Sequence, residues 1–141
     1  MNGLPAQARH RVSAPHKLQS IQNLVYSSVV KDVVFVGGSA NDLRSFPAVA
    51  RQRAGYQLYL VQLGLDPIDW KPMPQVGRGC REIRVRAEGD AYRVVYAVSV
   101  GDAVYVLHCF EKKTRQTPRV DVDLAKQRYR QVIDTLRKER P

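Results

Sequence analysis

Three β-strand patterns, separated only by short turns, constrain the fold of this chain more than any other feature. Residues 82–87 alternate between polar and apolar side chains, as expected for a strand with one buried face. Residues 88–90 supply a turn, residues 91–100 form a second strand pattern, and residues 104–110 form a third that is nearly all apolar. The Gly-Asp loop at 101–102 is a hairpin signal, because glycine tolerates positive φ. The sequence therefore predicts a three-stranded antiparallel meander.

Two helix patterns and one more strand surround this meander. Residues 32–37 form a β-branched and aromatic run that ends at two glycines, which is typical of a strand entering a turn. Apolar residues recur every three or four positions from 46 to 61, after an Asn-Asp pair at 41–42 that can cap a helix. Residues 65–79 contain three prolines and predict a loop, and a second amphipathic helix begins at Asp121. The predicted order is β-α-β-β-β-α, an α+β fold.

The length and composition favour one globular domain. The chain has 141 residues, of which 44% are hydrophobic and 26% charged. We place the domain at residues 30–141. Residues 1–29 contain no acidic residue and show weak periodicity, and we predict that they form a flexible basic N-terminal extension. Their composition also fits an organellar transit peptide.

The charge predicts a polyanionic partner. The formal net charge is +10, from 23 Lys and Arg against 13 Asp and Glu. The two cysteines are too few for a disulfide scaffold and no Cys/His cluster has zinc spacing, so we expect a reducing, cytoplasmic location and no structural metal. The longest apolar stretches have about eight residues, far from the roughly 20 that a membrane span needs. We expect no membrane association.

An ordered set of motifs carries a family resemblance. The series KDVVFVG, FPAVARQRAGYQLYLVQLGLDP, KPMPQVGRGCREIRV, YRVVYAV and VYVLHCFEKKTRQTP, closed by Ala125 and Arg128, resembles the phage-derived, HigB-like branch of the RelE/ParE superfamily of type II toxin-antitoxin toxins. The resemblance covers about residues 31–137. It implies a small twisted antiparallel sheet with helices packed on one face. It also implies a ribosome-dependent mRNA endoribonuclease that cuts the codon in the decoding site and so inhibits translation.

The same resemblance points to four catalytic cations. Arg93 of the YRVVY motif matches a strand arginine that faces the scissile phosphate, and Lys112 and Lys113 match a basic pair after the last strand. Arg84 aligns with a strand cation implicated in proton transfer or substrate placement. Neighbouring positive charges lower the pKa of a lysine and stabilise a phosphorane, so such a site needs no metal or other cofactor. Each residue also has a structural interpretation: Arg93 could simply pair with a carboxylate such as Glu82, and the lysines could lie in a solvated loop.

Three further residues are candidates for RNA binding. Arg86 shares a strand face with Arg84 by period-two alternation and is expected to contact RNA backbone, although both could form an ordinary solvated face. His108 lies in an apolar strand, where a structural role is favoured over catalysis. Phe110 could stack on a base.

Two other functional classes stay open. The RelE-type tyrosine that follows the basic pair is absent from residues 117–122, which leaves the acid and base unassigned. A ParE-like inhibitor would bind DNA gyrase without using these cations, and a generic basic module would bind nucleic acid without cleavage. For the toxin, the resemblance implies the ribosome and mRNA as partners, with a helix-turn-helix, HigA-like antitoxin encoded by an adjacent gene.

Overall fold

The computed structural model describes residues 9–10 and 30–140. Its strands are β1 (Arg9–His10), β2 (Val33–Phe35), β3 (Trp70–Pro72), β4 (Cys80–Ala87), β5 (Asp90–Ala97) and β6 (Val104–Lys112); its helices are α2 (Ser39–Arg44), α3 (Ala48–Gln62) and α4 (Arg119–Lys138). These elements confirm the α+β class. Apart from the backbone at β1, the N-terminal extension predicted at residues 1–29 lies outside the described residues.

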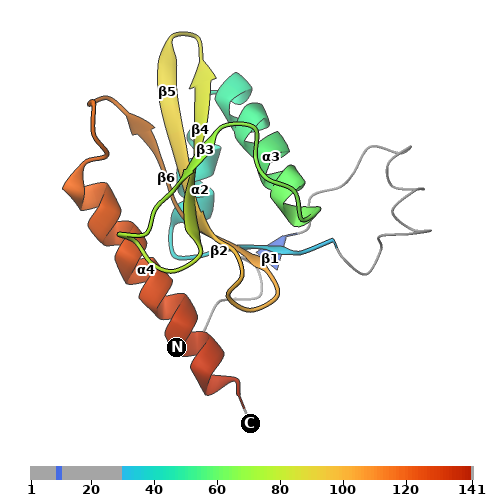
Figure 1. Cartoon of the computed structure of the whole chain (residues 1–141). Coiled ribbons are helices and arrows are strands. Elements are labelled where there is room, and N and C mark those ends of the chain that lie inside the picture. The colour runs from blue at the N-terminus through green and yellow to red at the C-terminus, as the bar shows by residue number, and fades with distance from the viewer. Residues whose placement is uncertain (1–8, 11–29, 141) are drawn as a thin grey trace.

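The predicted meander forms the centre of the sheet (Figure 1). The strand order is β1-β2-β6-β5-β4-β3, and the pairs β4/β5 and β5/β6 are antiparallel. The pair β2/β6 is parallel, so the sheet is mostly and not wholly antiparallel. A parallel pair needs a long crossover connection, which here contains α2, α3, β3, β4 and β5.

Three local elements differ from the sequence prediction. The proline-rich segment predicted as a loop contains β3, an edge strand in which Pro72 lies at the end, where a proline is tolerated. The predicted capping pair Asn41 and Asp42 lies inside the short helix α2. The β5–β6 connection spans residues 98–103, with positive φ at Ser99 and Gly101, and is longer than the predicted two-residue turn.

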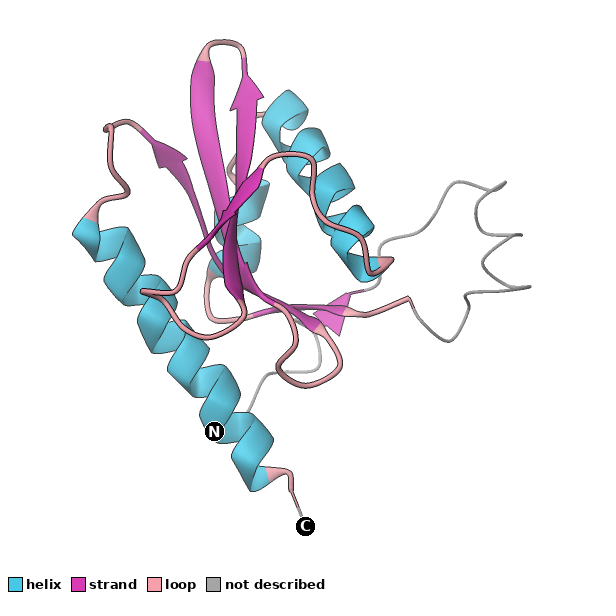
Figure 2. Ribbon diagram, in the orientation of Figure 1, coloured by secondary structure: helices cyan, strands magenta, loops and turns pink. Residues whose placement is uncertain are grey.

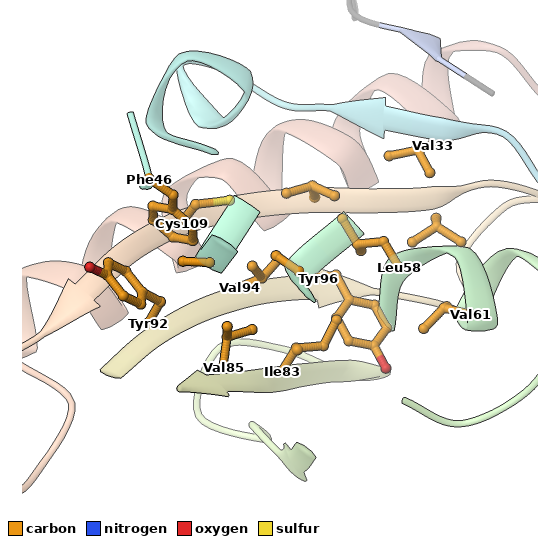
Figure 3. Close-up of a cluster of buried hydrophobic side chains, with 14 of the residues drawn as sticks. Val33, Phe46, Leu58, Val61, Ile83, Val85, Tyr92, Val94, Tyr96 and Cys109 are labelled. Atoms are coloured by element: carbon orange, nitrogen blue, oxygen red, sulfur yellow. The ribbon is translucent and has the colours of Figure 1, made fainter. Parts of the chain in front are cut away.

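The helices lie on both faces of the sheet, which corrects the prediction of a single covered face (Figure 2). The first core lies under α3, whose Ala54 and Leu58 pack with Val94 of β5 and the other residues drawn in Figure 3. The second core lies under α4, whose Ala125 and Val132 pack with residues such as Leu107 of β6. Because β5 is buried on both faces from Tyr92 to Ala97, a helix layer is needed on each side.

The face under α4 positions the candidate site. Residues of β4, β5 and β6 that share this face alternate with residues of the first core, and α4 covers only one end of it. Polar residues at the other end therefore stay within reach of a ligand. Over the described residues, no helix is both long and apolar enough to cross a membrane.

Candidate functional site

The strand register brings four of the predicted cations onto one face of the sheet. Arg84 of β4 lies directly opposite Arg93 of β5, and Arg86 and Lys112 both lie opposite Ala91. Directly opposed residues share a face with Cβ atoms about 5 Å apart. Lys71 of β3 lies opposite Glu82 of β4 on the same face. We call this set the cationic cluster: Lys71, Arg84, Arg86, Arg93 and Lys112.

Arg93 is the buried member of the cluster. Arg93 is only 8% exposed, and its Nη1 donates a hydrogen bond to the Tyr92 carbonyl at 3.0 Å. Its Nε lies 3.4 Å from Glu82 Oε1. Burial lowers the pKa of Arg93, an effect that Glu82 opposes and that the positive charges of Arg84 and Arg86 reinforce. A guanidinium held in this way is fixed in position before any substrate arrives.

Glu82 is the counter-ion at the base of the cluster. Its side chain is fully buried, although the sequence pattern placed it on the solvated face of the strand. Its Oε2 accepts a hydrogen bond from Thr117 Oγ1 at 3.1 Å, and Lys71 Nζ lies 3.8 Å from Oε1. A buried carboxylate requires such partners, because desolvation of an unpaired charge is costly. Lys71 and Thr117 were not among the predicted site residues, because their positions depend on the pairing of β3 with β4 and on the course of the chain between β6 and α4.

Lys112 joins the cluster, whereas Lys113 does not. Lys112 is the last residue of β6 and is partly buried. Burial is the largest cause of its lowered pKa, and Arg93, Lys71 and Arg84 lower it further, with Glu82 acting in the opposite direction. Lys113 follows the end of the strand and is exposed. The geometry thus distinguishes two lysines that the sequence treats alike.

The other two cations are more exposed. Arg84 forms an ion pair with Asp69, with Nε and Nη2 each 2.9 Å from Oδ1. Its side chain is 40% exposed, so it can reach a ligand while Asp69 limits its freedom. Arg86 is exposed. These two arginines form the open rim of the cluster.

His108 is buried between carboxylates of two helices. It is 6% exposed, its Nε2 lies 2.7 Å from Asp121 Oδ1 of α4, and its Nδ1 lies 3.7 Å from Asp42 Oδ2 of α2. It also stacks on Phe110, with ring centroids 5.0 Å apart. Phe110 lies opposite Arg93, so its ring forms one side of the cluster. His108 therefore supports the site through Phe110 and joins α4 and α2 to β6.

A family model decides the family of this chain. The model for the phage derived protein Gp49-like family (DUF891) matches residues 41–130, which is more than half of the chain. The chain belongs to this family. The Gp49-like family is a HigB-like toxin family of the RelE/ParE superfamily, so the resemblance seen in the sequence is confirmed. No curated protein matches the chain significantly.

The matched region contains every residue of the cationic cluster. Positive charge from four strands of the Gp49-like chain, β3 to β6, converges there on one face beside the buried carboxylate of Glu82. Such an arrangement can bind a phosphodiester and stabilise additional negative charge on it. The lowered pKa of Lys112 also increases the fraction of neutral amine, which can transfer protons. Over the described residues, no three His, Cys, Asp or Glu side chains form a group that could hold a metal ion.

Proposed function

We propose that this chain is the toxin of a type II toxin-antitoxin system and acts as a ribosome-dependent mRNA endoribonuclease. The observation that carries the proposal is the position of Lys112, whose pKa is lowered, in a cluster with the buried Arg93. Family membership supports a toxin, and the cluster supplies the groups that phosphodiester cleavage requires.

The reaction is an internal transfer at phosphorus. The 2′-oxygen of one nucleotide forms a bond to the adjacent phosphorus as its proton leaves, and the bond from phosphorus to the 5′-oxygen of the next nucleotide breaks as that oxygen gains a proton. The products are a 2′,3′-cyclic phosphate and a 5′-hydroxyl. Arg93 and Arg84 stabilise the negative charge of the phosphorane. The neutral amine of Lys112 accepts the proton of the 2′-hydroxyl, and the ammonium that results donates a proton to the departing 5′-oxygen. Arg86 holds the RNA backbone, and Phe110 offers an aromatic face beside the phosphate.

The decisive variant is Arg93→Ala. Loss of a positioned cation from the transition state should reduce the rate about 10² to 10³-fold. Wild type and variant are added to a translation reaction, and cut sites are mapped by primer extension. Arg130→Ala is the matched control, because Arg130 is an exposed arginine of α4 outside the cluster. Equal cleavage by a folded Arg93→Ala protein contradicts the proposed site.

Product chemistry and a gyrase assay separate the alternatives. We expect 2′,3′-cyclic phosphate ends, and we expect cleavage to persist when EDTA is added at a concentration that leaves the ribosome its magnesium, because the cluster provides the positive charge. Ends that carry a 3′-hydroxyl contradict this mechanism. Inhibition of DNA supercoiling without mRNA cleavage would support a ParE-like activity instead.

The partner that we propose is a helix-turn-helix antitoxin encoded by an adjacent gene. It would cover Arg84, Arg93 and Lys112 with carboxylates, or bind the helical side and prevent entry into the ribosome. Co-expression with each neighbouring small open reading frame, followed by co-purification, tests this partner. If no neighbour restores growth or binds the chain, the proposed partner is wrong.

A further inference from the structure

A groove lies between α3 and the edge of β4, beside the cationic cluster. It encloses about 480 Å³, within the range of small-ligand sites of about 300 to 1,000 Å³. Its lining comes from α3, the loop before β3 and one segment of β4: Gln52, Arg53, Tyr56, Gln57, Ile68, Asp69, Arg84, Val85 and Arg86. None of the functional residues predicted from the sequence lies in its α3 wall.

The groove exists because β3 pairs with only part of β4. Pairing of the two strands ends at Trp70 and Ile83, after which the Arg84 amide donates to the Asp69 carbonyl at 2.8 Å. The Gln57 side chain supplies hydrogen bonds in place of those that a longer β3 would form. Its Nε2 donates to the Arg84 carbonyl and its Oε1 accepts from the Asp69 amide, both at 3.0 Å. The backbone beneath the groove is thus largely hydrogen-bonded, and the edge of β4 beyond it is left open.

The walls of the groove are apolar and exposed. The residue Tyr56 is 54% exposed and Ile68 is 71% exposed. Five large hydrophobic residues are exposed in the described part of the chain, and two of them, Tyr56 and Ile68, line this groove. Because exposure of apolar surface is unfavourable, two such side chains facing one groove indicate a ligand with an apolar face.

The charge of the groove is positive. Arg53, Arg84 and Arg86 line it, against the single carboxylate of Asp69, which is already paired with Arg84. Arg53 Nη1 donates to the Arg86 carbonyl, which holds this arginine at the groove's edge. An exposed aromatic ring beside excess cations is the combination that binds single-stranded nucleic acid, since the ring stacks on a base and the cations hold its phosphates.

The groove meets the cationic cluster around the open edge of β4, because α3 covers the sheet face opposite the cluster. Arg84 and Arg86 belong to both sites. Lys112 on β6 is two strands from β4, a distance of about 10 Å at the usual strand spacing of about 4.8 Å. From β4 the path also turns around the strand edge to the α3 side, so a few nucleotides are needed to span it. A strand of RNA whose scissile phosphate lies at Arg93 and Lys112 therefore reaches the groove with a nearby nucleotide.

We propose that the groove is a subsite for a nucleobase of single-stranded RNA, with Tyr56 stacking on the base against Ile68, and Arg53 and Arg86 holding the adjoining backbone. The proposal deepens the proposed function and rests on it for the position of the scissile phosphate. The subsite holds a nucleotide close to the cleaved one, around the edge of β4, and so contributes to the choice of cut site.

The test uses the full chain and a 2′-O-methyl RNA heptamer, which lacks the attacking hydroxyl and so reports binding without cleavage. We expect the fluorescein-labelled heptamer to bind in low salt, and Tyr56→Ala to weaken binding at least about fivefold, the lower limit for loss of base stacking on an aromatic ring. Tyr56→Phe should retain most of the affinity. Leu65→Ala removes an equally exposed apolar side chain outside the groove and should have no effect.

A photo-crosslink locates the base directly. Trypsin releases residues 54–78 as one peptide, because Lys71 precedes a proline, and this peptide contains both apolar walls of the groove. A 4-thiouridine in the heptamer should crosslink to this peptide at Tyr56 or Ile68. Absence of this crosslink, or equal affinity of Tyr56→Ala and wild type, overturns the subsite and favours a protein segment as the occupant of the open β4 edge.

The two proposals fail in distinguishable ways. Arg93→Ala should lose cleavage while it retains the Tyr56 crosslink. A wild-type chain that gives the crosslink but cuts no mRNA on ribosomes would overturn the proposed activity and leave the base-binding groove in place. A chain that cuts mRNA but binds the heptamer equally well with and without the Tyr56 ring would overturn the base-binding groove and leave the proposed activity in place.

Discussion

Arg93 is buried beside two other arginines, and one carboxylate stabilises its charge. Glu82 is fully buried, and its contacts with Arg93, Lys71 and Thr117 come from three separate segments. Period-two alternation in the sequence was enough to place Arg84 and Arg86 on a common face, whereas the register of β4 and β5 brings Arg93 onto it. It could not reveal Lys71 or Thr117, because their positions depend on pairing of β3 and on the approach to α4.

Glu82→Gln tests whether this carboxylate is a positioning residue. The variant leaves Arg93 without its buried counter-ion and should lower the free energy of unfolding by about 3 to 5 kcal/mol. Because Glu82 raises the pKa of Lys112, its loss should also move the pH dependence of cleavage toward lower pH. Glu82→Asp keeps the negative charge and should shift the pH dependence of cleavage less than Glu82→Gln does. A pH profile that does not change, measured on folded protein, would show that Glu82 only stabilises the fold.

Lys112→Met should remove activity without loss of stability. The lowered pKa of Lys112 means that its charged form is less stable in the folded chain than in the unfolded chain. At pH 7, which is well below the ordinary lysine pKa, this cost is present, so an apolar side chain of similar length should raise the free energy of unfolding. The advantage should shrink as the pH rises through the lowered pKa of Lys112 toward its ordinary value, where the wild-type amine also becomes neutral.

Urea denaturation at pH 7 and pH 10, together with the cleavage assay, checks this prediction. Lys113→Met is the matched control, since Lys113 is exposed and lies outside the cluster. It should change neither stability nor cleavage by much. If Lys113→Met loses cleavage and Lys112→Met does not, the assignment of the two lysines is reversed.

At the scale of elements, the sequence predicted the regular pieces well and their layering poorly. The meander and α4 follow directly from alternation and from apolar spacings of three and four. The short strand β3 was hidden by prolines, and the position of α4 on the second face depends on packing over the whole sheet. One signal was present: β5 carries apolar residues on both faces, which is typical of a strand covered on both sides.

Gly37→Ala tests how closely α4 packs on the turn after β2. Gly37 has φ of 56°, and a Cβ there would lie 2.7 Å from Arg128 Nε. Arg128 of α4 donates to the Leu107 carbonyl at 2.8 Å, so its displacement would disturb the contact between α4 and β6. We expect Gly37→Ala to lower the free energy of unfolding by more than the roughly 1 to 2 kcal/mol that positive φ alone costs.

Gly89→Ala is the control for this prediction, because it has φ of 84° and no atom within 4 Å of the added Cβ. It should show the cost of positive φ alone. In an Arg128→Ala background the difference between the two substitutions should disappear. A difference that persists there would place the clash elsewhere.

At the scale of the whole molecule, charge determines how partners approach. The net charge of +10 creates a positive field around the chain, and the cluster and the groove concentrate it around the open edge of β4. Such a field attracts cellular RNA as well as the intended substrate. The antitoxin that we propose is therefore expected to be acidic, so that it binds quickly and covers the field.

The last prediction concerns the rate of this association. Steering by opposite charge weakens as salt shortens the Debye length from about 10 Å at 0.1 M to about 3 Å at 1 M. We expect the association rate constant of the chain and its co-purified antitoxin, measured by stopped-flow fluorescence, to fall at least about tenfold over this range, with a smaller change in the dissociation rate.

Two pairs of substitutions show which face the antitoxin covers. The double variant Arg84→Ala and Arg86→Ala should weaken the salt dependence of the association rate if the antitoxin covers the cluster. If the antitoxin binds the helical side, replacement of Lys126 and Arg130 on the exposed face of α4 by alanine should weaken this salt dependence instead. An association rate that does not change with salt would show that the net charge does not steer this partner.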